Sequence, residues 1–145
     1  MLQYYKKKGK TMKKIFVPMS LIVLYFQLST LNSTLWEVRQ DGFISTIQTA
    51  IYYAADGDSI LVHPGRYVEN IDFLGKSISL FSLAITTGND EYVEQTIIDG
   101  DDSGSVVYIY DCTDAYLGGF TLTNGFGTEN IHNYSLGGGV QIRYS

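Results

Sequence analysis

The chain has 145 residues, enough for one small domain. All 15 acidic residues lie at or after Glu37, whereas six of the ten lysines and arginines precede Ile15, so residues 34–145 carry four basic and 15 acidic side chains, formally −11. This charge opposes binding to nucleic acid or anionic lipid, and a hydrophobic content of 45% with 14% aromatic residues argues against intrinsic disorder.

The first 33 residues are expected to be a secretory signal peptide. Lys13 and Lys14 precede an apolar run over residues 15–26, and small and polar residues follow the run. A basic start, a short apolar core and a small-residue exit are typical of such a signal. As a helix the run reaches about 20 Å, less than the roughly 30 Å of a bilayer's hydrocarbon core, so we expect no stable membrane span in the mature chain.

The mature chain is expected to begin at a cleavage between Ser29 and Thr34, and Met12 is a candidate for the true start of translation. A retained membrane anchor is the alternative interpretation. With a cleaved signal, residues 34–145 work outside the cytoplasm, at the cell surface or in the medium.

One helix is expected at the start of the mature domain. Ser45 is a suitable N-cap for a helix over residues 46–55, and Asp56 to Asp58 are expected to end it, with Gly57 in the left-handed C′ conformation. Helical spacing predicts one apolar face, formed by Ile44, Ile47, Ala50, Ile51 and Ala54.

Short strands are expected after Asp58, because apolar residues there recur at every second position. No second helix is expected between them. Ile60, Ile78, Ile97, Phe120 and Val140 recur roughly every 20 residues, and repetition on this scale is typical of a solenoid. An antiparallel sandwich is the alternative. The expected strands span residues 59–63, 66–73, 77–82, 95–99, 105–110, 117–123 and 137–143.

Alternation along these strands divides the side chains into an inward and an outward set. Asn124 is expected in the left-handed region, and Cys112, the only cysteine, is expected to be a small buried residue. The expected inward set is Ile60, Val62, Ile78, Leu80, Val107, Ile109, Phe120, Leu122, Val140 and Ile142.

These segments resemble the opening of secreted right-handed parallel β-helix proteins of the pectin lyase-like superfamily, which includes pectate lyases and pectin methylesterases. The resemblance spans roughly Gly42 to Arg143 and is carried by turn residues and inward positions. It implies an all-β fold, a right-handed parallel β-helix with an N-terminal capping α-helix, and it implies no particular activity. The segments that carry it are residues 46–51, 54–71, 75–80, 96–100, 119–125 and 137–140.

The resemblance does not extend to a catalytic motif. Pectate lyases of this fold bind Ca²⁺ through carboxylates and abstract a proton with Arg or Lys, and the methylesterases use two Asp and an Arg. No position in this chain matches either motif, so no catalytic residue, metal ligand or cofactor is assigned. Asp99, Asp101 and Asp102 are interpreted as a solvated turn, with a calcium loop as the alternative.

One outward face is a candidate for binding. If Val107 and Ile109 point inward, then Tyr108 and Tyr110 point outward, where aromatic rings can stack on sugars. Cover by loops or by further coils is the alternative. The candidate carbohydrate-binding residues are Phe81 from an earlier coil, Tyr108, Tyr110 and Arg143, with Gln141, Asp111 and Asp114 nearby.

We therefore expect an exported extracellular or cell-surface β-helix scaffold that contacts polysaccharide. The alternative is the N-terminal part of a polysaccharide lyase or a pectinesterase-like carbohydrate-active enzyme, and a structural adhesin stalk is a third interpretation. The apolar strand that precedes Tyr144 and Ser145 suggests a truncated β-helix, or self-association through an uncapped last coil.

Overall fold

The computed structural model describes residues 4–7, 10–13, 33–129 and 135–143. The chain divides into two units, Met1–Asn32 and Ser33–Ser145. In the first, β1 (Tyr4–Lys7) pairs antiparallel with β2 (Lys10–Lys13). The apolar run over residues 15–26 lies outside the described residues, so the signal peptide stays a prediction. None of the described helices is long and apolar enough to cross a membrane.

The described residues of the second unit form mainly short strands, with three helices. The helices are α2 (Ile47–Tyr53), α3 (Leu83–Thr87) and α4 (Glu91–Gln95). The strands are β3 (Leu35–Val38), β4 (Ser59–Val62), β5 (Gly65–Val68), β6 (Ile71–Asp72), β7 (Ser79–Ser82), β8 (Thr96–Asp99), β9 (Val107–Tyr110), β10 (Tyr116–Gly118), β11 (Thr121–Thr123), β12 (Thr128–Glu129), β13 (Ser135–Leu136) and β14 (Val140–Arg143).

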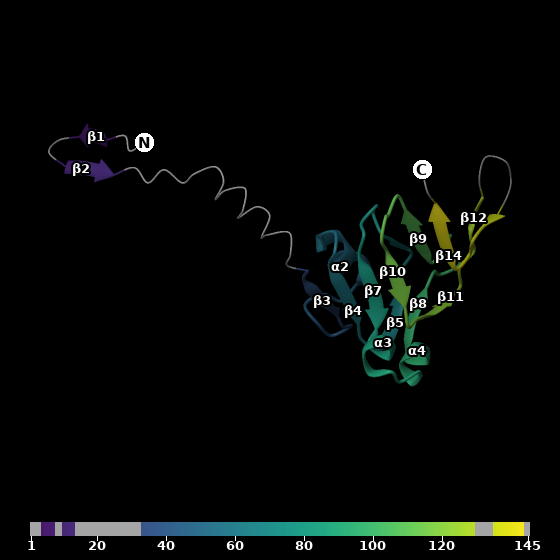
Figure 1. The fold of residues 1–145 in the computed structure, drawn as a ribbon. Coiled ribbons are helices and arrows are strands. Elements are labelled where there is room, and N and C mark those ends of the chain that lie inside the picture. The colour runs from purple at the N-terminus through teal and green to yellow at the C-terminus, as the bar shows by residue number, and fades with distance from the viewer. Residues whose placement is uncertain (1–3, 8–9, 14–32, 130–134, 144–145) are drawn as a thin grey trace. The chain divides into compact units, whose positions relative to one another are not determined.

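These strands form three parallel sheets, ordered β10-β7-β4-β3, β11-β8-β5 and β14-β9-β6, while β12 pairs antiparallel with β13. From β4 onward the chain visits the three sheets in the same order three times, as β4-β5-β6, β7-β8-β9 and β10-β11-β14 (Figure 1). Equivalent residues stack in register, so Ile60 lies beside Leu80 and Leu80 beside Leu117. The mostly β fold is therefore confirmed.

The predicted alternation holds for the core. Ile60, Leu80 and Val107 are fully buried, and Phe120 and Leu122 are partly buried against the same cluster. Ile142 lies beside the buried Ile109, on the predicted inward side, but it is 55% exposed. β14 is the last strand of its sheet in the described part of the chain, so no further strand covers this side chain.

The predicted repeat is wrong in detail. Ile60 pairs with Leu80 and not with Ile78, and Ile97 lies in a different sheet from both. Two short helices that the sequence did not predict, α3 and α4, lie between β7 and β8. They lengthen the chain between β7 and β8, so equivalent residues of successive passes are not evenly spaced in the sequence.

Helix α2 matches the predicted helix in position but is shorter. Its N-cap is Thr46 and not Ser45, because the Thr46 hydroxyl accepts a hydrogen bond from the Thr49 N–H at 3.3 Å. The helix ends at Tyr53, so Gly57, with φ 86°, belongs to the following turn and is not its C′ residue. The predicted face is confirmed, because Ile47, Ala50, Ile51 and Ala54 are buried and Ile44 is partly buried.

Side-chain amides bond to the outer edges of the first strands of two sheets. The Gln48 amide donates to the Asp72 carbonyl at 3.1 Å and accepts from the Asp72 N–H at 2.8 Å, on the side of β6 away from β9. The Gln40 amide donates to the Arg66 carbonyl of β5 at 2.6 Å. These bonds satisfy backbone groups that an edge strand otherwise leaves to water or to another chain.

Two glycines allow a close approach between backbones. A Cβ atom at Gly125 would lie 1.8 Å from the Gly138 carbonyl oxygen, so neither position accepts a side chain without backbone movement. At Gly139 the same atom would meet nothing within 4 Å. Beside Gly125, Asn124 has φ 52°, which confirms its predicted left-handed conformation.

Candidate functional site

The predicted aromatic face lies on the sheet β14-β9-β6. Val107 and Ile109 of β9 turn into the core, so Tyr108 and Tyr110 turn to the other side of the strand. The two tyrosine ring centroids lie 5.3 Å apart, with 30° between the ring planes. In the parallel register, Arg143 of β14 lies beside Tyr110. The structure thus brings together three of the four predicted binding residues.

A cavity of about 370 Å³ adjoins this face, and we call it the Tyr108 cavity. Its lining comes from strands β9 and β14, from the loop that leads into β9, and from Asn70, which precedes β6. Its size falls in the range of small-molecule sites. The cavity is lined by Asn70, Ser103, Gly104, Ser105, Tyr108, Gln141 and Arg143.

Hydrogen bonds fix the polar wall of the Tyr108 cavity. The Asn70 amide donates to the Ser105 carbonyl at 3.0 Å. The Ser105 hydroxyl lies 2.7 Å from the Gly137 carbonyl oxygen and 3.2 Å from the Gln141 amide oxygen. Gln141, predicted to point outward, lies on the predicted side but is only 6% exposed. These contacts join three segments that are distant in sequence.

The Tyr108 cavity is lined by one aromatic ring and several polar side chains. Tyr108 supplies an aromatic surface, and Arg143 supplies guanidinium donors that suit hydroxyl or carboxylate oxygens. Asn70 and Gln141 carry amides that both donate and accept. Although the chain is strongly acidic, no carboxylate belongs to the described lining.

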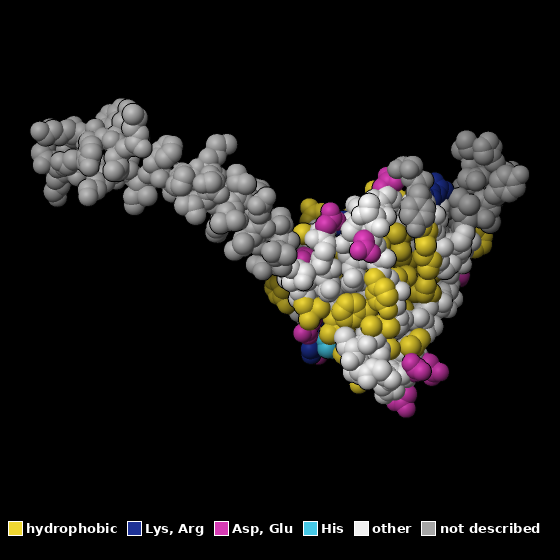
Figure 2. Space-filling view, in the orientation of Figure 1, with side chains coloured by type: hydrophobic (Ala, Val, Ile, Leu, Met, Phe, Trp, Pro, Cys, Tyr) yellow, Lys and Arg dark blue, Asp and Glu magenta, His cyan; other side chains and the backbone are white. Residues whose placement is uncertain are grey.

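Phe81 does not belong to this site. It lies on β7 in the four-stranded sheet, beside Leu61 of β4 and Gly118 of β10. Figure 2 shows hydrophobic side chains gathered over the part of the molecule that Figure 1 labels β4, β7 and β10. The grouping of Phe81 with Tyr108 is therefore wrong, because the two residues belong to different sheets.

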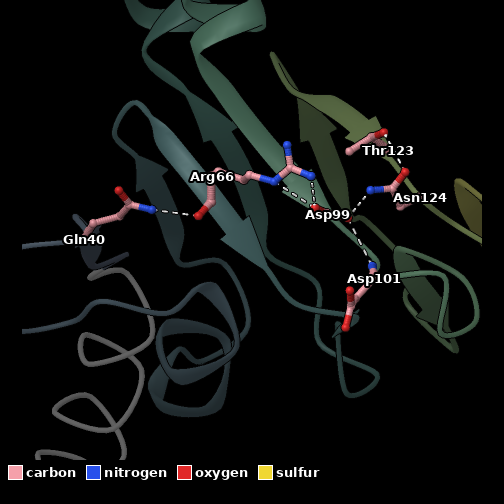
Figure 3. A network of polar contacts seen from close by, with 6 residues as sticks. All are labelled: Gln40, Arg66, Asp99, Asp101, Thr123 and Asn124. Atoms are coloured by element: carbon pink, nitrogen blue, oxygen red, sulfur yellow. Dashed lines mark hydrogen bonds and ion pairs between the residues drawn. The ribbon is translucent and has the colours of Figure 1, made fainter.

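A second polar cluster surrounds Asp99, at the end of β8 (Figure 3). Arg66 of β5 forms an ion pair with the Asp99 carboxylate, with its Nε at 2.8 Å. The Asn124 amide donates to the same carboxylate at 2.8 Å, and the Asp101 N–H does so at 3.1 Å. Asp99 thus joins residues that follow or belong to three successive strands of one sheet.

The environment of Asp99 makes it a structural residue. Hydrogen bonds from the Asp101 N–H and the Asn124 amide, together with Arg66, lower the pKa of Asp99, so the carboxylate is a weaker base than an isolated aspartate. The solvated-turn interpretation is wrong for Asp99, which is buried, and holds for Asp101 and Asp102, which are exposed. Among the described residues, no three His, Cys, Asp or Glu side chains gather in a way that could hold a metal ion.

Sequence reasoning missed the polar half of the Tyr108 cavity. Asn70 and Ser105 carried no pattern that linked them, because their contact depends on the stacking of β6 against β9. Tyr108, Tyr110 and Arg143 were accessible to prediction because strand alternation alone assigns their side. Cys112 is buried as predicted, and burial raises the pKa of its thiol.

Comparisons with protein-family models, with curated proteins and with solved structures gave no match for this chain.

Proposed function

We propose that this chain is an exported β-helix protein that contacts polysaccharide through the Tyr108 cavity and the adjoining Tyr110 ring. The observation that carries the proposal is the placement of two tyrosine rings on β9, in register with Arg143 of β14 and beside a cavity of about 370 Å³ that Arg143 also lines. Aromatic surface together with a few fixed polar groups is the usual composition of a site that orients a small ring.

The proposed architecture is a right-handed parallel β-helix of the pectin lyase-like type. Its support is the repeated visit to three parallel sheets in a constant order, together with stacked columns such as Ile60, Leu80 and Leu117. Each pass through the three sheets then corresponds to one coil. A connection between parallel strands of one sheet is right-handed in almost all proteins, which favours that handedness.

Export is supported by the sequence alone. The basic start, the apolar run over residues 15–26 and the small polar residues after it make a secretory signal. The strongly acidic remainder suits a protein that does not bind nucleic acid. The proposed location is the cell surface or the medium.

Affinity electrophoresis in gels that contain soluble polysaccharides tests the proposed contact. We expect retardation of the wild-type chain by at least one polysaccharide in a panel of neutral and uronic-acid polymers. The double variant Tyr108→Ala/Tyr110→Ala should be retarded less, because each ring contributes roughly a few- to tenfold in affinity.

Tyr116→Ala is the matched control, because Tyr116 is an exposed tyrosine in the four-stranded sheet. Its retardation should equal that of the wild type. Equal retardation of the double variant and the wild type would refute the assignment of the Tyr108 cavity. Absence of retardation by every polymer would refute polysaccharide contact itself.

A further inference from the structure

A second cavity, of about 360 Å³, lies against helix α2, and we call it the Trp36 cavity. Trp36 of β3 and Tyr53 of α2 form part of its wall, and their ring centroids are 6.3 Å apart with 23° between the planes. Phe43 and Ile44 complete it from the loop between β3 and α2, together with Thr49 of α2. This site belongs to a different sheet edge from the Tyr108 cavity.

The Trp36 ring is held in place, whereas the Phe43 and Tyr53 rings of the cavity are open to solvent. The Trp36 indole N–H donates to the buried Asp58 carboxylate at 3.0 Å, and the rest of the ring packs against the core. Phe43 is fully exposed, although two backbone hydrogen bonds close its loop, from the Arg39 N–H to the Ile44 carbonyl at 3.0 Å and from the Gly42 N–H to the Arg39 carbonyl at 2.9 Å. The loop therefore leaves the Phe43 ring in solvent on the wall of the cavity, where a ligand can reach it.

The chemistry of the lining selects the ligand. Among the described residues that line the Trp36 cavity, none is charged, in a chain that is formally −11 over residues 34–145. Aromatic faces carry partial negative charge and attract the C–H bonds of a pyranose ring. The Thr49 hydroxyl accepts from the Thr46 hydroxyl at 2.6 Å, so its own proton can be donated to a sugar oxygen.

We propose that the Trp36 cavity binds the ring of a neutral pyranose sugar. The inference rests on the proposed function, contact with polysaccharide, but it concerns a separate site and a narrower ligand class. An acidic polymer is disfavoured here because the lining offers no cation and the surrounding chain repels anions. Asp58 acts as a positioning residue, since it orients the indole and does not line the cavity.

The experiment follows the fluorescence of Trp36, which is the only tryptophan of the chain. The full chain is titrated with cellohexaose, xylohexaose and mannohexaose as neutral probes, and with an oligogalacturonate as the acidic probe. We expect a saturable change in intensity or wavelength with at least one neutral probe and no saturable change with the acidic probe.

Phe43→Ala should raise the apparent Kd of that probe by roughly two- to tenfold, because one stacking ring is removed. Phe43 is fully exposed, so the variant should fold like the wild type. Phe126→Ala is the matched control, because Phe126 is 73% exposed and does not line either cavity. Its apparent Kd should equal that of the wild type.

Three results would overturn the inference: no saturable response to any neutral probe, equal affinities for Phe43→Ala and Phe126→Ala, or a response to the amphipathic, anionic dye ANS alone. The last would show an apolar docking surface for a protein. The double variant Tyr108→Ala/Tyr110→Ala separates the two proposals, because it should reduce gel retardation while leaving the fluorescence response of Trp36 intact. Failure of either assay alone therefore identifies which site is wrong.

Discussion

Asp58 is the residue whose replacement tests the packing of the first strand most directly. Its carboxylate is buried and accepts three hydrogen bonds, from the Thr34 N–H at 2.7 Å, the Ala55 N–H at 2.9 Å and the Trp36 indole at 3.0 Å. It thereby ties β3 to the end of α2. The Asp58→Asn substitution keeps the size of the side chain and removes one of its two acceptor oxygens.

The cost follows from the geometry of the three donors. One carboxylate oxygen accepts from Trp36 and Ala55, and the other accepts from Thr34. An asparagine that keeps its oxygen on the first two donors turns its NH₂ group toward the Thr34 N–H. One charge-assisted hydrogen bond is lost and two donors face each other, which costs about 2 kcal/mol of the free energy of unfolding.

Urea unfolding monitored by Trp36 fluorescence measures this loss. A change of about 2 kcal/mol should lower the midpoint by about 1 M for a domain of this size. Asp56→Asn is the control, because Asp56 is exposed and accepts only from the Ser77 N–H in the described structure, so its unfolding free energy should change by about 0.5 kcal/mol or less. Equal midpoints for the two variants would refute the structural role of Asp58.

The pH dependence gives an independent check of the same carboxylate. Burial raises the pKa of Asp58, but the hydrogen bonds from Ala55, Thr34 and Trp36 outweigh it and hold the pKa below its ordinary value of 3.8. The contribution of Asp58 is therefore complete above the unfolded pKa and is lost as pH falls through the lower folded pKa. Stability of Asp58→Asn should consequently fall less steeply than wild type in acid, and parallel pH profiles would contradict this.

Three further predictions concern packing, reactivity and association. Gly125→Ala should destabilise the fold by about 3 kcal/mol or more, because its Cβ would overlap the Gly138 carbonyl, whereas Gly139→Ala should be nearly neutral in the same urea assay. Cys112 should react with a disulfide reagent only on unfolding, since its thiol is buried with a raised pKa, and rapid labelling of the native chain would contradict this. Sedimentation of residues 33–145 should show self-association that Ile142→Lys abolishes, because Ile142 is 55% exposed on β14, which no further described strand covers, and a monomer at all concentrations would refute it.

Patterns of period two and period 3.6 were enough to place most of the secondary structure. The segment from Ser59 to Val62 and the helix face of Ile47 and Ile51 were predicted because each signal is local. Strand β3 was missed because its four residues include both Trp36 and Glu37 and show no clear alternation. Its place in the fold depends on pairing with β4 and on the Asp58 carboxylate, neither of which can be inferred from neighbouring residues.

The candidate sites, too, could be predicted only where the signal lies in neighbouring residues. The side on which Tyr108 lies follows from alternation, but the cavity beside it requires Asn70 and Gln141, which stacking brings together from distant segments. Phe81 was misplaced for a related reason, since sequence spacing does not tell which of three sheets a strand joins. Helices α3 and α4 changed that spacing, and their five-residue lengths are too short for a period to be recognised.

The paired hydrogen bonds between Gln48 and the backbone of Asp72 have a consequence for growth of the molecule. A primary amide presents one donor and one acceptor side by side, as a peptide unit does. The Gln48 side chain therefore occupies the backbone groups of Asp72 to which another strand would otherwise bond. The Gln40 amide forms one such hydrogen bond, to the Arg66 carbonyl of β5. The two edges of each of these sheets are therefore not equivalent. Among the described strands, none pairs with β11 on the side away from β8 or with β14 on the side away from β9, while at the opposite ends of those two sheets an incoming strand must first displace a glutamine.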